Sequence, residues 1–332
     1  MAAASVLAAL VAAVGGVLIG YSNIPAGDIL GNVASHLGIG HSRLSPLQSA
    51  IIWQLRAPRV VLGLLVGSML AVAGGTYQGV FRNPLADPYL LGIAAGAGLG
   101  ATIAIADIGH GGQVPTWTPW LAFLGAMIAV TATWTVGGRG ARTNTAVLVL
   151  AGVAISSLLT SAQTFLQQSS ANSISQVYLW LLGSLAGATW PQIELVAPYV
   201  VVCCLVCIAA GRALDVMSVG DVESRALGLP ASRVRLAVVV ASSLGTAAVV
   251  SVCGLIGFVG IIIPHLVRLA VGTSYRRILP ISVALGAAFL VVCDTIARTV
   301  LSGGELPIGV VTALVGAPVF VLVLNVTRRP TT

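Results

Sequence analysis

Long apolar segments follow one another along the chain, separated by short polar or Gly/Pro-rich stretches. A helix that crosses a bilayer needs about 20 mostly apolar residues, and most of these segments reach that length. The pattern predicts an all-α polytopic membrane protein with about ten transmembrane helices. They are expected at about 2–20, 60–81, 90–106, 117–137, 145–167, 192–211, 236–255, 258–271, 279–300 and 307–326.

The third and eighth segments are short, and helix-breaking residues precede both. Asn83, Pro84, Asp87 and Pro88 stand before the third segment, and residues 254–257, bounded by two glycines, stand before the eighth. Transporters often contain interrupted helices whose ends lie within the membrane. These two segments are therefore candidates for helices that start inside the bilayer.

A faint internal repeat accompanies this pattern. A shift of 174 residues (233 − 59) pairs Arg59 with Arg233, and six nearby positions are identical as well. The two matching segments enter the membrane from opposite sides in the topology below, as an inverted repeat requires. In so apolar a sequence, chance is the competing explanation.

Composition supports a membrane location. The 332 residues are 57% hydrophobic and 8% charged, with a mean hydropathy of +1.02, whereas soluble domains carry about a quarter charged residues. The 39 glycines suit closely packed membrane helices. The whole chain, 1–332, is expected to form a single transmembrane domain, and its first segment, which lacks a basic start, is interpreted as a span rather than a signal peptide.

The arginines predict the orientation. Four of the 16 basic residues, Arg43, Arg56, Arg59 and Arg298, fall on one side of the membrane, and the other twelve fall on the opposite side. The positive-inside rule places the majority, and both termini, in the cytoplasm. The basic residues are scattered between apolar segments, so topology explains the net charge better than nucleic-acid binding does.

Three connecting segments are long enough to form structure. The outside segments, about 21–59 and 168–191, have room for short helices, and the inside segment, about 212–235, is the most charged. Within it, Val219 to Leu227 can form one short amphipathic helix closed by Gly228 and Pro230. It is either a solvated loop or a helix that fits the groove of a cytoplasmic partner.

Arg56, Arg59 and Arg298 are the most informative charges, because they lie on the side where positive charge is disfavoured. They either contact lipid headgroups and internal acids, or they dock an acidic partner outside the membrane. Asp294 and Arg298 lie four residues apart on one helix and are expected to pair. This pair would compete with docking at Arg298.

Other candidate chemistry is sparse. The five cysteines lie in apolar stretches without acid or histidine neighbours, which favours packing over metal binding. His265 beside Pro264 is isolated, and Glu305 before Pro307 suits the start of the last helix. No nucleotide-binding loop or hydrolytic constellation occurs, so the chain is not expected to be an enzyme, and any ATP hydrolysis must come from another chain.

Four stretches together resemble the FecCD family of ABC-importer permeases, which serve ferric siderophores, haem and cobalamin. The resemblance runs from about Trp53 to Leu324. The stretches are Leu55 to Arg59 with Leu64-Leu65-Val66-Gly67, Gln78 to Pro88 with Leu91-Gly92, Gly257 to Gly260 with Ile263 to Leu269, and Glu305 to Ala313 with Gly316-Ala317-Pro318.

The resemblance implies a bacterial inner-membrane importer that works by alternating access. Its parts would be two copies of the permease (a homodimer or close paralogues), two cytoplasmic ATPase subunits that hold ATP and Mg, and an extracytoplasmic solute-binding protein. No cofactor or metal would bind the permease itself. Arg56, Arg59 and Arg298 match positions where a cobalamin permease of the family receives acidic residues of its binding protein.

The resemblance also assigns cytoplasmic roles. Thr145 falls near the family's cytoplasmic gate, although Ala146 replaces a polar residue there. The family's coupling loop to the ATPases is matched by Gly220, Asp221, Glu223, Arg225, Leu227 and Gly228.

Two alternatives remain for the cargo and one for the mechanism of transport. An iron chelate, either a ferric siderophore or haem, is the leading expectation, and cobalamin is the alternative within the family. An ion-coupled secondary transporter is the alternative of another class, with Asp294 as its clearest mid-span acid.

Overall fold

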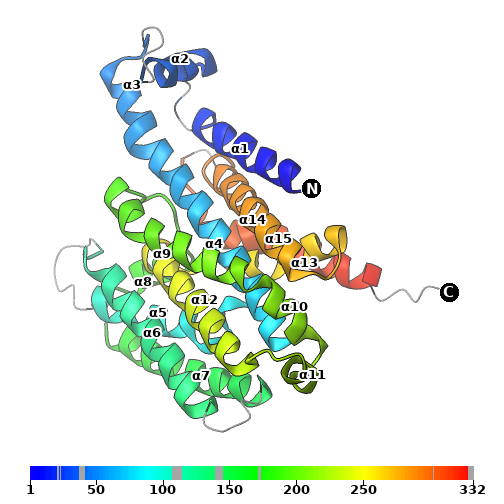
Figure 1. The fold of residues 1–332 in the computed structure, drawn as a ribbon. Coiled ribbons are helices and arrows are strands. Elements are labelled where there is room, and N and C mark those ends of the chain that lie inside the picture. The colour runs from blue at the N-terminus through cyan, green and yellow to red at the C-terminus, as the bar shows by residue number, and fades with distance from the viewer. Residues whose placement is uncertain are drawn as a thin grey trace.

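The computed structural model describes residues 1–20, 22, 24–36, 42–106, 114–138, 145–170, 173–301 and 303–327. Helices form its regular structure, and no strand occurs in these ranges (Figure 1). Every predicted span corresponds to a helix. They are α1 (Ala2–Leu18), α4 (Ala57–Phe81), α5 (Ile93–Ala106), α6 (Thr118–Gly137), α7 (Thr145–Ser169), α9 (Trp190–Ala209), α12 (Ala231–Cys253), α13 (Val259–Val271), α14 (Tyr275–Ala297) and α15 (Ile308–Thr327).

Among the described residues, six helical segments are long and apolar enough to cross a membrane, and α1, α5, α13 and α15 are shorter apolar helices. The most apolar windows of α4, α12 and α14 are 78%, 72% and 67% buried, against 17% for α7. The first three therefore form the centre of the bundle, and α7 lies at its periphery, where lipid would cover it.

Glycines allow the central helices to approach closely. A Cβ atom on Gly67 of α4 would lie 2.2 Å from the carbonyl oxygen of Gly286 of α14, and one on Gly74 would lie 1.9 Å from that of Gly260 of α13. Only hydrogen fits there, so the backbones of α4, α13 and α14 pack directly on one another.

The short helices α5 and α13 start inside the bundle. Gly92, just before α5, lies beside Ala129 and Ser156 in the middle of α6 and α7. The segments that precede both helices bond to each other, because the Tyr89 hydroxyl donates to the carbonyl oxygen of Ile256 (3.0 Å) and accepts from its N–H (3.2 Å). Tyr89 belongs to the 3₁₀ turn η2 (Pro88–Leu91), whose first turn Asp87 caps by accepting from the Tyr89 N–H.

The two helices that the internal repeat matches, α4 and α12, each pack against the two helices of the other half that an inverted repeat pairs with one another. Helix α4 packs against α13 and α14, and α12 packs against α5 and α6. The start of α12 lies at the same end of the bundle as the end of α4 (Figure 1), so the two matching helices run in opposite directions.

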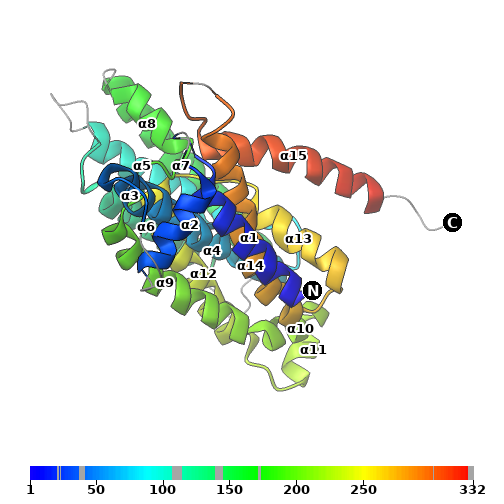
Figure 2. The same cartoon turned by 90° about the horizontal axis from the view of Figure 1, so that it is seen from above.

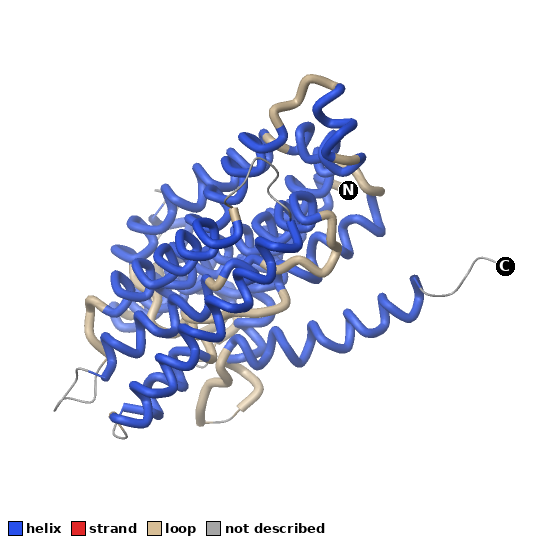
Figure 3. Tube along the Cα trace, turned by 90° about the horizontal axis from the view of Figure 1, so that it is seen from below, coloured by secondary structure: helices blue, strands red, loops and turns tan. Residues whose placement is uncertain are grey.

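Short helices occupy both predicted outside segments. Helices α2 (Ala26–His36) and α3 (Pro46–Ala50) and the π-helical turn η1 (Ile51–Arg56) precede α4, and α8 (Ile174–Leu181) precedes α9. The last helix, α15, leans away from the bundle and projects from it (Figures 2 and 3), although its first half contacts α13 and α14.

The helix predicted from Val219 to Leu227 is present but shorter, because a break at Gly220 excludes its first two residues. Helix α10 (Gly211–Val219) ends at Val219, and a separate helix, α11, spans Asp221–Ala226. Gly220 separates them with φ 150°, which favours glycine, and a Cβ there would collide with the Glu223 carboxylate. The turn therefore folds α11 back instead of continuing α10.

Candidate functional site

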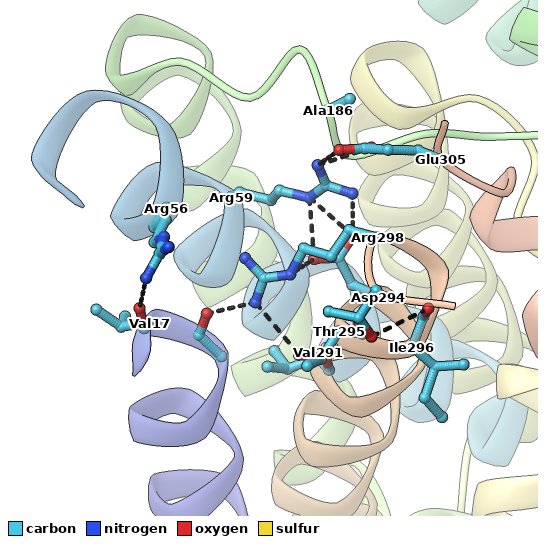
Figure 4. A network of polar contacts seen from close by, with 12 residues as sticks. Val17, Arg56, Arg59, Ala186, Val291, Asp294, Thr295, Ile296, Arg298 and Glu305 are labelled. Carbon is cyan, nitrogen blue, oxygen red and sulfur yellow. Dashed lines mark hydrogen bonds and ion pairs between the residues drawn. The ribbon is translucent and has the colours of Figure 1, made fainter. Parts of the chain in front are cut away.

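Five charged residues meet at the end of α4 and α14 that lies beside α2 and η1 (Figure 4). We call Arg56, Arg59, Asp294, Arg298 and Glu305 the charge cluster. Two come from the junction of η1 and α4, two from the end of α14 and its C-cap, and one from the segment before α15. All three predicted docking arginines lie in it, and all three are buried within this chain.

A change of helix type positions the first two arginines. Pro58 has no N–H to donate, and its ring disfavours a regular turn before it. The preceding turn is π-helical, with the N–H of Ala57 bonded to the carbonyl oxygen of Ile52, five residues earlier. Arg56 is the last residue of this turn, and Arg59 lies in the first turn of α4. Such π turns are frequent at functional sites.

Arg59 is held by two carboxylates. Its Nε atom donates to both Asp294 oxygens at 2.9 and 3.0 Å, and its Nη2 lies 2.9 Å from Oδ1. Its Nη1 donates to Glu305 at 2.9 Å. The Asp294 side chain is 2% exposed and that of Glu305 is 43% exposed, so water screens the second ion pair far more than the first.

The other two arginines have different partners. The Nε atom of Arg298 lies 3.7 Å from Asp294, which confirms the predicted pair four residues apart, and its Nη2 donates to the carbonyl oxygen of Gly16 in α1. Arg56 donates to the carbonyl oxygens of Val17 and Leu18 and to both oxygens of Ser22. These four hydrogen bonds of Arg56 thus all go to neutral oxygens.

The charge cluster carries an excess of positive charge beside an open cavity. Three arginines against two carboxylates leave a formal charge of +1 (3 − 2). The adjoining cavity, of about 390 Å³, is lined by Arg56, Arg59, Arg298 and Glu305 together with Gly20, Ser22, Ile51, Leu55 and Ala186. A buried cation attracts an anion more strongly than an exposed one does, so this end of the molecule suits a carboxylate.

Sequence reasoning missed the bonds that organise the charge cluster. Arg59 and Asp294 are 235 residues apart, and Glu305 was interpreted only as a residue suited to a helix start. One signal was available: an acid in the last turn of a helix is unfavourable with respect to the helix dipole, so Asp294 needed a cationic partner beyond Arg298.

The segment α10–α11 lies at the opposite end of α4 and α14 (Figure 1). Leu227 and Val219 are exposed there, and Gly228 ends the segment with φ 76°. The backbone of α11 is described, whereas the side chains of Asp221 and Arg225 lie outside the described residues. Exposed apolar side chains on a short helix suit contact with another protein.

Asp215 of α10 connects this segment to α14. It accepts a hydrogen bond from the Tyr275 N–H at 2.5 Å and another from the Ser274 hydroxyl at 2.8 Å. Ser274, the N-cap residue, makes no capping bond itself. The first turn of α14 is therefore capped by a residue of another helix.

An apolar cavity of about 560 Å³ lies along α15. It is lined by Leu181, Leu182, Leu255, Gly257, Gly309, Val310, Ala313, Leu314, Ala317 and Pro318. These walls carry no charge and no aromatic ring, so they offer a large solute weak contacts.

The other predicted positions have structural surroundings. Thr145 is the first residue of α7, and Pro307 directly precedes α15. In the turn that contains Pro84 and follows α4, the side chain of Asn83 accepts a hydrogen bond from the Leu85 N–H. Pro264 lies inside α13 and packs against Gly75 of α4. In the described ranges no three His, Cys, Asp or Glu side chains are grouped to hold a metal ion.

Comparisons with known proteins agree with these features. The profile of the FecCD transport family matches residues 6–325. The chain is 41% identical over 277 residues to the cobalamin import system permease protein BtuC of Halobacterium salinarum, covering 83% of this chain and 73% of that protein. It is 37% identical over 287 residues to the vitamin B12 import system permease protein BtuC of Escherichia coli O9:H4, covering 86% of each.

A solved structure has the same fold over its full length. An inward-facing putative metal-chelate type ABC transporter superposes with a TM-score of 0.84 at 28% identity and covers 98% of both chains.

Proposed function

The chain belongs to the FecCD transport family, and from that premise we propose that it forms the membrane pathway for cobalamin or a closely related corrinoid. It is a permease subunit of an ABC importer, a multi-pass inner-membrane protein and not itself a catalytic enzyme.

The observation that carries the cargo assignment is the similarity to cobalamin permeases, at 41% identity over 83% of the chain. This reverses the order expected from sequence alone, in which an iron chelate led. The lining of the 560 Å³ cavity suits the passage of a bulky solute. Its uncharged aliphatic side chains would bind such a solute too weakly to retain it. An iron chelate remains the second candidate, supported by the similarity to the metal-chelate type transporter.

The charge cluster is proposed as the docking site of an extracytoplasmic solute-binding protein. An acidic side chain of that protein would enter the 390 Å³ cavity and face Arg56, whose four hydrogen bonds described above go to neutral oxygens. Docking would bring the cargo to the mouth of the pathway, and complementary charge would speed the encounter.

The segment α10–α11 is proposed to contact the ATPase subunits. Gly220, Asp221, Glu223, Arg225, Leu227 and Gly228 would transmit their closure, and Thr145 would lie near the cytoplasmic gate. A second copy of the permease would cover the projecting face of α15, completing the pathway between two chains. Both termini would then be cytoplasmic.

A reconstituted transport assay tests the function. Proteoliposomes would hold the permease and ATPase subunits, with the solute-binding protein and Mg-ATP supplied on the matching sides. We expect uptake of cobalamin that requires ATP and exceeds uptake of a ferric siderophore or haem. Preference for the iron chelates would overturn the cargo assignment, and uptake driven by an ion gradient without ATPase subunits would overturn the transport mechanism.

Two variants test the site roles. Reversal of Arg56 to Glu should weaken docking of the solute-binding protein while the variant still assembles with the ATPase, because Arg56 bonds to neutral oxygens and not to the buried Asp294. Replacement of Glu223 and Arg225 by Ala should leave docking intact and reduce the stimulation of ATP hydrolysis. Unchanged docking in the first variant, or unchanged stimulation in the second, would refute the corresponding role.

A further inference from the structure

Glu305 holds one of the donor nitrogens of Arg59, and both residues line the open cavity. Asp294 engages Nε and Nη2 of Arg59, and Glu305 engages Nη1. We propose that Glu305 is a competitor for docking: it occupies the position on Arg59 that an acidic side chain of the extracytoplasmic partner takes, and it gives way when that partner arrives. This inference rests on the docking role proposed above.

Burial distinguishes the two carboxylates. The Asp294 side chain is 2% exposed, both of its oxygens accept hydrogen bonds from Arg59, and one of them lies 3.7 Å from Nε of Arg298. Removal of this carboxylate would leave two buried guanidinium groups without the anion that they share. Glu305 is 43% exposed and bonds only to Nη1 in the described structure. Water replaces its contact at little cost, so Glu305 is the carboxylate that another can displace.

The backbone around Glu305 is fixed, so displacement needs only its side chain to move. The next residue, Leu306, donates its N–H to the carbonyl oxygen of Ala297 at 3.0 Å. Two residues further on, the N–H groups of Ile308 and Gly309 bond to Gly183 and Leu182 at 3.2 and 3.0 Å. The carboxylate lies at the cavity wall beside Arg56 and Arg298, where a rotated side chain has room.

The net charge of the cluster determines whether Glu305 raises or lowers the affinity for an acidic partner. With Glu305 in place the cluster carries +1, and with Gln there it would carry +2 (3 − 1). A partner carboxylate would then meet Arg59 without displacing another anion. Glu305 therefore lowers the affinity of docking, and it supplies Arg59 with a partner as the docked protein leaves, which speeds release.

The test measures docking affinity for Glu305→Gln. The permease–ATPase complex in nanodiscs would be titrated with the importer's solute-binding protein, and in parallel with a fluorescent hexaglutamate peptide as a probe of the charge cluster. We expect Glu305→Gln to bind both about two- to fivefold more tightly, the range of an exposed ion pair. In a double-mutant cycle, Arg59→Gln should abolish this gain.

Glu194→Gln is the matched control. Glu194 is an exposed acid near the start of α9, the helix whose Trp190 donates to the carbonyl oxygen of Trp53 in η1. It removes one negative charge at the same end of the molecule without contacting Arg59, so its effect on affinity should be small. If Glu305→Gln does not assemble, Glu305→Asp, whose shorter side chain reaches Arg59 less well, should show a smaller gain.

The outcomes separate this inference from the docking proposal. Equal or weaker binding by Glu305→Gln, or an equal gain from Glu194→Gln, would overturn the competitor role while docking to the wild type stands. Absence of saturable binding of either probe to the wild type would overturn both.

Discussion

Replacement of Asp294 by Asn should destabilise the protein far more than removal of the other carboxylate in the charge cluster, Glu305. The carboxylate lies 2.9–3.0 Å from two nitrogens of Arg59 and is 2% exposed. Asn keeps the size but removes the charge, and its amide N–H₂ would face guanidinium donors. Removing one member of a buried ion pair costs about 3–5 kcal/mol, because the other charge stays buried.

The matched comparison is Glu305→Gln, which also removes a carboxylate from Arg59. The Glu305 side chain is 43% exposed, so the expected cost is about 0–1 kcal/mol. Thermal unfolding in detergent, followed by tryptophan fluorescence at one scan rate, should show a fall of about 10 °C for Asp294→Asn and at most a few degrees for Glu305→Gln.

Equal midpoints for the two variants would refute this reasoning, since burial would then not decide the cost. A further check is the double variant Asp294→Asn with Arg59→Gln. Removing both partners takes away the uncompensated charge, so this variant should recover part of the lost stability.

Three further predictions concern other parts of the bundle. Gly67→Ala should cost about 1–3 kcal/mol, because its Cβ would lie 2.2 Å from a carbonyl oxygen, whereas Gly15→Ala, with nothing within 4 Å, should be neutral or stabilising; similar thermal midpoints would contradict this. Asp215→Ala should reduce stimulation of ATP hydrolysis by the solute-binding protein while basal hydrolysis remains, and Asp215→Asn, which keeps an acceptor, should retain most of it; an unchanged ratio in the alanine variant would exclude the role. Burial raises the pKa of Asp87 from 3.8 to about 6, so the folded state holds this proton more tightly and the stabilisation it gives below pH 4 is lost as pH rises through 6. The midpoint of Asp87→Asn should fall less than that of the wild type between pH 4 and 7, and parallel profiles would contradict the assignment.

The sequence predicted the helices better than their contacts. Each span could be located because lipid requires a continuous apolar stretch of fixed length, and the early breaks before α5 and α13 followed from Pro84, Pro88 and the glycines at 254 and 257. The Asp294–Arg298 pair could be predicted because helix geometry alone brings residues four apart together.

Contacts between distant segments could not be predicted in this way. The bond from Arg59 to Asp294 spans 235 residues and depends on the close packing of α4 and α14, which single residues do not specify. The break at Gly220 was missed because amphipathic periodicity outweighed one glycine, whereas the backbone there needs φ 150°. The cap that Asp215 places on α14 likewise requires two helices to meet.

That cap has a mechanical consequence. Helix α14 contains 23 residues, or about 35 Å of stiff rod, and each of its ends is fastened by a side chain from elsewhere: Asp215 at the first turn and Arg59 at the last. An axial pull on α10 therefore reaches Asp294 without any loop that could absorb it. Helix α14 therefore links a displacement of α10 at one face of the membrane to the ion pairs of the charge cluster at the other face.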